Sequence, residues 1–167
     1  IYERGPVHFS LSPAMDIQVA SNFERYLYFQ FGGDSERVKT FMSGFQDNQT
    51  STLEHLHGDF DWFQAGAVTD AETVATIEKV FDQCGYLADP HTAVGIAIAE
   101  QYQRDDVPMV AVATAHPAKF VEAVGRALPQ TPNHHPTLQA LAGKETRRYD
   151  LAASEASLKT FIEGACT

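Results

Sequence analysis

The chain has 167 residues, enough for one compact domain with a hydrophobic core, and its two cysteines form neither a disulfide framework nor a zinc-binding spacing. Its net charge is -10, and no lysine- or arginine-rich run offsets this acidity, which argues against nucleic acid and anionic membranes as partners. No apolar run reaches the roughly 20 residues that span a bilayer, and the N-terminus does not resemble a signal peptide. We therefore expect a soluble cytoplasmic protein.

Two helices are expected in the N-terminal third of the chain. Ser21 and Glu24 have the spacing of a capping box, and the aromatic run that follows predicts a helix over residues 21–31. Ser35 is the N-cap candidate for a second helix, because apolar residues recur after it at helical spacing as far as residue 45. Each helix presents one apolar face for packing.

The next two helices carry stronger start and stop signals. Thr69 and Glu72 form a second capping box, an apolar stripe follows, and Gly85 occupies the position of a glycine that ends a helix. Asp89 and Pro90 then predict the start of another helix, with proline at the first helical position, where its missing N–H costs nothing.

Three segments have strand character. Residues 107–114 (VPMVAVAT) form a nearly continuous apolar run, which is typical of a buried strand in an α/β protein. Residues 59–68 favour a short strand or an aromatic-anchored loop, and residues 147–151 alternate like an exposed strand.

Helices complete the pattern. A helix should start at Pro117 and stop before Pro129, with further helices near residues 137–142 and around Phe161. Helices with a few strands predict an α/β layer protein. So few strands make an incomplete sheet, and the chain begins with isoleucine rather than methionine, so we expect it to be part of a larger protein.

The end of the expected strand at residues 107–114 is the first candidate site, because open α/β sheets bind ligands beyond the carboxyl ends of their strands. Thr114, His116 and Lys119 lie at this junction. A purely structural explanation, in which Thr114 ends the strand and His116 caps the following helix, fits these residues as well as a site does. His91 should point inward from the first turn of its helix, either as a buried structural residue or as part of a site.

Arg25 is a candidate for binding an anion. The charge of Arg25 near a helix start opposes the helix dipole, and either a bound anion or a nearby carboxylate would offset this. The remaining histidine pairs fall in expected loops without cysteine or carboxylate partners: His55, His57, His134 and His135. We expect no metal site.

Three segments, taken in order along the chain, resemble threonine synthases. They are LSPAMDIQVASNFER (11–25), LADPHTAVG (87–95) and VATAHPAKF (112–120). The resemblance implies a helix-rich, C-terminal portion, residues 1–167, of a fold-type-II enzyme of the tryptophan synthase β-like class that depends on pyridoxal 5'-phosphate (PLP). Threonine synthases convert O-phospho-L-homoserine and water into L-threonine and phosphate.

The resemblance also implies roles for individual residues. Thr114 would lie beside the pyridine nitrogen of PLP, where a hydroxyl does not hold that nitrogen protonated as an aspartate would. The other residues expected to line the cleft or to contact the substrate phosphate are His91, His116, Lys119, Asn22 and Arg25.

Two motifs of the family do not occur in this sequence, namely the Schiff-base lysine and the loop that holds the cofactor phosphate. We expect both in a missing N-terminal portion of the same polypeptide, so the chain alone should be inactive and without PLP. Two alternatives stay open: a threonine-synthase-like phospho-lyase acting on O-phosphothreonine, and a stand-alone module that has lost catalysis.

Overall fold

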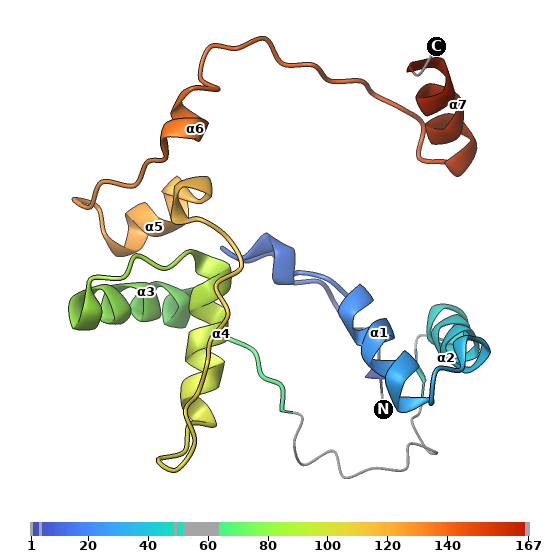
Figure 1. The fold of residues 1–167 in the computed structure, drawn as a ribbon, viewed down its shortest axis with the longest axis horizontal. Helices are drawn as coiled ribbons and strands as arrows, with labels where there is room; N and C mark the ends of the chain where they lie inside the picture. The colour runs from blue at the N-terminus through green and yellow to red at the C-terminus, as the bar shows by residue number, and fades with distance from the viewer. Residues whose placement is uncertain (1, 4, 49, 52–63, 166–167) are drawn as a thin grey trace. The chain divides into compact units, whose positions relative to one another are not determined.

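A computed structural model describes residues 2–3, 5–48, 50–51 and 64–165 of the chain (Figure 1). Its internal contacts divide the chain into two units, Ile1–His134 and His135–Thr167. This differs from the single compact unit expected from length. Neither helix of the second unit has a buried residue, and apolar side chains such as Leu141 and Ile162 stay exposed there.

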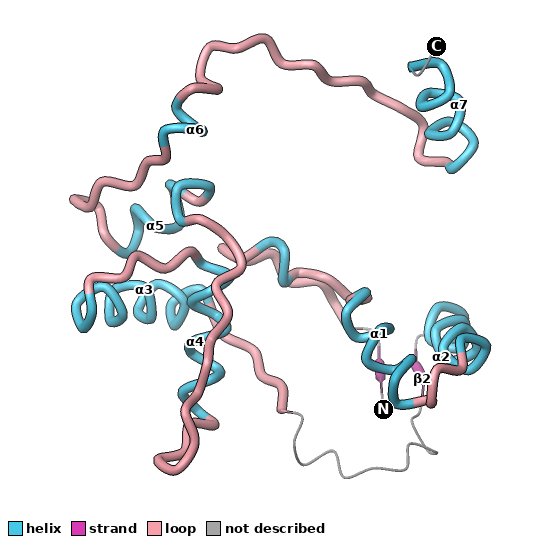
Figure 2. Tube along the Cα trace, in the orientation of Figure 1, coloured by secondary structure: helices cyan, strands magenta, loops and turns pink. Residues whose placement is uncertain are grey.

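Helices and loops make up most of the described chain, and its strands are short (Figure 2). The first unit contains β1 (Tyr2–Glu3), η1 (Pro13–Met15), α1 (Ser21–Gln30), α2 (Ser35–Asn48), β2 (Thr50–Ser51), α3 (Asp70–Cys84), α4 (Pro90–Gln101), η3 (Pro117–Lys119) and α5 (Val121–Ala127). The second unit contains α6 (Pro136–Gln139) and α7 (Glu155–Ala165). The strands β1 and β2 pair antiparallel, with Tyr2 opposite Ser51. None of the described helices has both the length and the apolar character needed to cross a membrane.

Helices α1 and α2 pack through a hydrophobic cluster. Leu27 of α1 is fully buried against Phe41, Met42 and Phe45 of α2. The two helices form where sequence analysis expected them. The predicted capping box at the start of α1 is wrong, however, because the N-cap is Ala20 and no side chain caps the helix.

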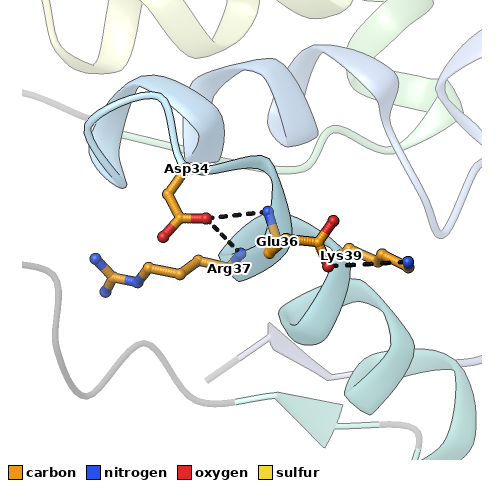
Figure 3. A network of polar contacts seen from close by, with 4 residues as sticks. All are labelled: Asp34, Glu36, Arg37 and Lys39. Atoms are coloured by element: carbon orange, nitrogen blue, oxygen red, sulfur yellow. Dashed lines mark hydrogen bonds and ion pairs between the residues drawn. The ribbon is translucent and has the colours of Figure 1, made fainter.

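The cap of α2 also differs from the prediction. Asp34, and not Ser35, accepts hydrogen bonds from the first free amides of the helix, those of Glu36 (3.0 Å) and Arg37 (3.1 Å), as Figure 3 shows. Within the same turn, Glu36 pairs with Lys39 at 3.9 Å. A carboxylate oxygen can accept hydrogen bonds from both amides at once, and its negative charge interacts favourably with the positive end of the helix dipole. Asp34 is therefore a better cap than Ser35.

Helix α3 matches its prediction at both ends. The Thr69 hydroxyl accepts from the Glu72 amide (3.3 Å), and the Glu72 carboxylate accepts from the Thr69 amide (2.8 Å). Gly85 ends the helix in the left-handed conformation, with φ +69°, and donates its N–H to the Phe81 carbonyl at 2.7 Å. Both predicted signals are confirmed.

Replacing Gly85 by alanine should lower the free energy of unfolding by about 1 kcal/mol, because a Cβ strains left-handed backbone. A Cβ at Gly85 would meet no atom within 4 Å, so this cost comes from the backbone alone. Denaturant unfolding measures it. The matched control is Gly95→Ala inside α4, which also meets nothing within 4 Å and should be neutral or stabilising. Equal losses in both variants would contradict the explanation.

The cap of α3 should also make stability depend on pH. The hydrogen bond from the Thr69 amide, followed by that from its hydroxyl, holds the pKa of Glu72 below its ordinary value of 4.5. A lowered carboxyl pKa stabilises the fold above pH 4.5, and this contribution is lost as the pH falls through the folded-state pKa. Glu72→Gln should therefore flatten the fall in unfolding midpoint between pH 5 and pH 3. An unchanged pH profile would exclude this role.

A second hydrophobic cluster joins α3, α4 and α5. Ile77 of α3, Ala93 of α4 and Ala127 of α5 are buried together. Helix α4 starts as predicted, with Asp89 as N-cap and Pro90 at the first position. This cluster fixes the first turn of α4, which carries the residues of the candidate site.

The strand predicted at residues 107–114 is not formed in the described chain. Apart from an isolated bridge between Arg104 and Val107, the segment has no strand partner, and Val110 and Val112 are 79% and 75% exposed. After the turn at residues 105–106, the segment runs back beside α4 (Figure 1), and the Thr114 amide is hydrogen-bonded to Thr92 in the first turn of that helix. A buried strand needs neighbouring strands on both edges, and the described residues provide none here.

Two further expectations differ from the structure, and a third falls partly outside the described residues. The helix predicted to start at Pro117 is divided into η3 and α5 at Phe120, whose φ of -128° and ψ of 50° are not helical. Residues 147–151 have no strand partner, although Tyr149 packs on Phe161 of α7 at 4.9 Å between ring centroids. The segment 59–68 lies partly outside the described residues, and its described part, 64–68, is irregular.

Candidate functional site

Three segments that are distant in sequence meet at the first turn of α4. The Ser12 hydroxyl is hydrogen-bonded to Nδ1 of His91, the Thr114 amide donates to Thr92, and the Phe120 ring packs on His91. These segments contain the same three motifs that the sequence analysis singled out. The fold therefore brings the motifs together around one helix start.

Asp89 is the most deeply buried charged residue of this cluster, with 1% of its surface exposed. Its Oδ1 accepts from the amides of His91 (2.9 Å) and Thr92 (3.2 Å), and its Oδ2 accepts from the Thr92 hydroxyl. These donors and the positive end of the helix dipole stabilise a carboxylate in a place closed to water.

His91 points inward, as predicted, and is 8% exposed. Its ring lies edge-on to Phe120, with centroids 4.5 Å apart and planes at 79°. The ring thus connects the segment at Ser12 to the segment that follows Thr114. This contact supports a positioning role for His91.

His116 is the N-cap of η3 and Lys119 is its last residue, and both are exposed. Nδ1 of His116 accepts from the Ala118 amide at 3.1 Å and caps η3, which is the capping alternative left open by sequence. Beside His116 lies a pocket of about 340 Å³. Asn133 lines this pocket, donates Nδ2–H to the Pro117 carbonyl at 2.9 Å and leaves its buried Oδ1 without a hydrogen-bond partner.

Asn22 and Arg25 lie together on the exposed face of α1. The guanidinium of Arg25 donates to Oδ1 of Asn22 at 3.0 Å and forms no ion pair with Glu24 or Asp16, the carboxylates suggested by sequence. Arg25 and Lys39 line a groove of about 510 Å³ between α1 and α2. The residues that line this groove are separate from the described residues of the cluster around Asp89, so the candidate site has two distinct parts.

Sequence reasoning did not single out Ser12, Thr92 or Asn133 as site residues. Ser12 is 2% exposed and Thr92 is 3% exposed, so both are polar residues buried at the junction of the motifs. Both lie inside the motifs at residues 11–25 and 87–95, which was the available signal. Among the described residues, which do not include His55 and His57, no three or more histidine, cysteine, aspartate or glutamate side chains are arranged for a metal.

Comparisons with known proteins match the same region. A family model described as "Threonine synthase, C-terminal" matches residues 92–162. Threonine synthase of Pseudomonas aeruginosa is 37% identical over 169 residues, which cover 96% of this chain and 35% of the relative. The chain belongs to the threonine synthase family. It corresponds to the C-terminal part of these proteins and spans about a third of the length of such relatives.

Solved structures of the threonine synthase family have the same fold. PLP-bound threonine synthase from Brucella melitensis is 36% identical, with a TM-score of 0.78 over 98% of this chain and 36% of that one. Threonine synthase from yeast is 30% identical, with a TM-score of 0.71 over 97% of this chain and 37% of that one. The expected family and fold class, a helix-rich part of a fold-type-II enzyme, are confirmed.

Proposed function

We propose that this chain is the C-terminal part of a threonine synthase that converts O-phospho-L-homoserine and water into L-threonine and phosphate with PLP as cofactor. The observation that carries the proposal is the meeting of three family motifs, around His91, Thr92 and Thr114, in one hydrogen-bonded cluster. Family membership supports the reaction, and the cluster supplies an ordered place for the chemistry.

Thr114 is the residue proposed to contact the pyridine nitrogen of PLP. Two observations fit this role: its side chain is exposed, and its backbone is tied to α4 through Thr92. When bound, PLP supplies an electron sink that stabilises negative charge on the substrate. A threonine hydroxyl beside the ring nitrogen leaves that nitrogen unprotonated, so more of the stabilisation must come from the surrounding site.

His91, His116 and Lys119 are proposed to line the cleft. Nδ1 of His116 is used to cap η3, so this nitrogen serves structure rather than proton transfer. His91 holds the Phe120 ring next to the site. Lys119 is exposed and adds a positive charge for an anionic substrate.

Asn22 and Arg25 are proposed to contact the phosphate of O-phospho-L-homoserine. Asn22 accepts one N–H of the guanidinium and so orients Arg25 without neutralising it. The remaining guanidinium donors match phosphate oxygens in geometry and charge.

Residues 1–167 are proposed to form the C-terminal portion of the enzyme, with the Schiff-base lysine and the phosphate-binding loop supplied by polypeptide outside this chain. Lys39, Lys79 and Lys159 support this assignment, because each forms an ion pair with a glutamate on the same unit. The exposed apolar run at residues 107–114 also supports it, since such a run favours neighbouring strands. We propose that the chain alone binds PLP weakly and has no activity.

The test of the proposed function uses the natural protein that contains this sequence. Incubation with O-phospho-L-homoserine and PLP should release phosphate and L-threonine in equal amounts. Release of 2-oxobutyrate from O-phosphothreonine, without threonine from O-phospho-L-homoserine, would instead identify a phospho-lyase. A natural protein with neither activity would support the non-catalytic module.

The 167-residue chain alone should not form a stoichiometric Schiff base. Incubation with equimolar PLP, reduction with borohydride and intact mass measurement should show no single lysine labelled, because the amine that forms the aldimine lies elsewhere. Lys119 is the residue to check first by peptide mapping, since it lies closest in sequence to Thr114. Complete labelling at one lysine would contradict the proposed division of the enzyme.

A further inference from the structure

The hydroxyl of Thr92 has two partners with different requirements. It donates its single proton to Oδ2 of Asp89, because a carboxylate can only accept. Its oxygen lone pairs are then left to accept, and the Thr114 amide donates to that oxygen at 3.2 Å. The direction of the Thr92 hydroxyl is therefore set by Asp89, and the place of the Thr114 amide is set by Thr92.

Burial makes this chain of hydrogen bonds rigid. Asp89 is 1% exposed and Thr92 is 3% exposed, so bulk water does not compete for either side chain. Asp89 is also held by the amides of His91 and Thr92 in the first turn of α4. A buried network whose donors and acceptors are paired fixes its members more firmly than exposed hydrogen bonds do.

The segment from Thr114 to Phe120 is attached to α4 at both of its ends. Thr114 is attached through the Thr92 hydroxyl, and Phe120 is attached through ring contact with His91. Before Thr114, the segment has no strand partner among the described residues as far back as residue 108. The Thr92 hydroxyl is thus the anchor at the point where the exposed run meets the site.

We propose that Asp89 and Thr92 are positioning residues that fix the backbone at Thr114, and with it the hydroxyl that faces the pyridine ring of PLP. This inference rests on the proposed function. In this proposal neither residue contacts the cofactor. Asp89 orients the Thr92 hydroxyl, and Thr92 holds the Thr114 amide.

The experiment compares Thr92→Val with Thr92→Ser in the natural protein. Valine has the shape of threonine but cannot accept from Thr114, whereas serine keeps the hydroxyl. Thr92→Val should speed hydrogen–deuterium exchange of the Thr114 amide in the apo-protein by about fivefold or more, the effect of losing one hydrogen bond. It should weaken PLP binding, measured by fluorescence titration, by a similar factor. Thr92→Ser should restore both values.

Asp89→Asn provides a second variant that keeps the helix cap. Asparagine caps helices as well as aspartate does, and its carbonyl can still accept the amides of His91 and Thr92. Its NH₂ group then occupies the place of Oδ2 and donates to the Thr92 hydroxyl, so the hydroxyl proton loses the acceptor that kept it pointing away from the Thr114 amide. Exchange at Thr114 should rise although α4 remains intact.

Thr76→Val is the matched control. Thr76 is a buried helical threonine, 7% exposed, whose hydroxyl donates to the Glu72 carbonyl at 2.7 Å. Its hydroxyl bonds within α3 and not to Thr114, so neither exchange at Thr114 nor PLP affinity should change. A rise in both with Thr76→Val would show that general loosening of α3 explains the result, and would overturn the inference.

The remaining outcomes also decide the question. Unchanged exchange at Thr114 in Thr92→Val and Asp89→Asn would overturn the inference, as would faster exchange with unchanged PLP affinity. Failure of the unmodified natural protein to bind PLP would reject the proposed function itself. That result is recognised before any variant is compared.

Discussion

Replacing Ile77 by alanine should lower the free energy of unfolding by about 2–5 kcal/mol, the range for deleting a fully buried large aliphatic side chain. Ile77 has 0% of its surface exposed and packs against Ala93 and Ala127. The buried neighbours are alanines, which cannot fill the space, and the larger Val74 and Leu128 lie at the partly buried edge of the cluster, so much of the cavity should persist. Chemical denaturation of the natural protein, followed by tryptophan fluorescence and circular dichroism, measures the loss.

The control for Ile77→Ala is Val121→Ala at the start of α5. Val121 is 60% exposed, so its truncation should change stability by no more than about 0.5 kcal/mol. The cluster around Ile77 holds α3, α4 and α5 together, so Ile77→Ala should also weaken PLP binding through the first turn of α4. Equal effects of Ile77→Ala and Val121→Ala would show that this cluster does not support the fold.

Helices α3 and α4 were predictable because the signals that define their ends are local. Thr69 and Glu72 lie three residues apart and satisfy each other, and Gly85 needs only its own backbone freedom to end α3. Asp89 caps α4 through the two amides that follow it. Such signals depend on a few consecutive residues, so they are readable without knowledge of the tertiary structure.

Cap assignment failed where two neighbouring residues competed. Ser35 has the residue type of an N-cap, but Asp34 precedes it and accepts two amides with one carboxylate oxygen. At α1, Ser21 matches the capping pattern with Glu24, yet Ser21 is the first helical residue and the N-cap is Ala20, one residue earlier. The sequence therefore predicted the positions of both helices correctly but assigned the N-cap of each to the wrong residue.

The run at residues 107–114 shows a limit of a different kind. Its apolar side chains predict a buried strand, and Val110 is 79% exposed instead. Strand formation depends on partners that are distant in sequence, whereas helix formation is largely local. The apolar composition of the run favours burial between neighbouring strands, and the described part of the chain does not provide such strands.

The candidate site was predictable as a set of motifs and not as a network. Ser12 and His91 are 79 residues apart, and Thr92 and Thr114 are 22 residues apart. No local spacing rule relates residues at such separations, so the contacts are visible only once the chain is folded. The inward orientation of His91 was predictable, because it follows from helical periodicity alone.

Replacing Arg25 by alanine in the natural protein should raise the KM for O-phospho-L-homoserine by about 10- to 100-fold, the effect of losing charge-assisted hydrogen bonds to a phosphate. Arg25 is exposed and bonded to the neutral side chain of Asn22, so its positive charge is available for an anion. PLP affinity should stay unchanged, because the proposed contact of Arg25 is with the substrate. Steady-state kinetics and a separate PLP titration measure the two quantities.

Arg126→Ala is the matched control for Arg25→Ala. Arg126 is also an exposed helical arginine, on α5, but it pairs with Glu122 at 2.8 Å and so already has an anionic partner. Its loss should leave the KM within about twofold of the original value, since exposed ion pairs contribute little. If Arg25→Ala left the KM unchanged, or weakened PLP binding as much as substrate binding, the groove between α1 and α2 would not be the phosphate contact. In that case Asn22→Ala should have no effect on the KM either. If the groove does bind the phosphate, Asn22→Ala should raise the KM, but by less than Arg25→Ala does, because asparagine orients the guanidinium without supplying charge.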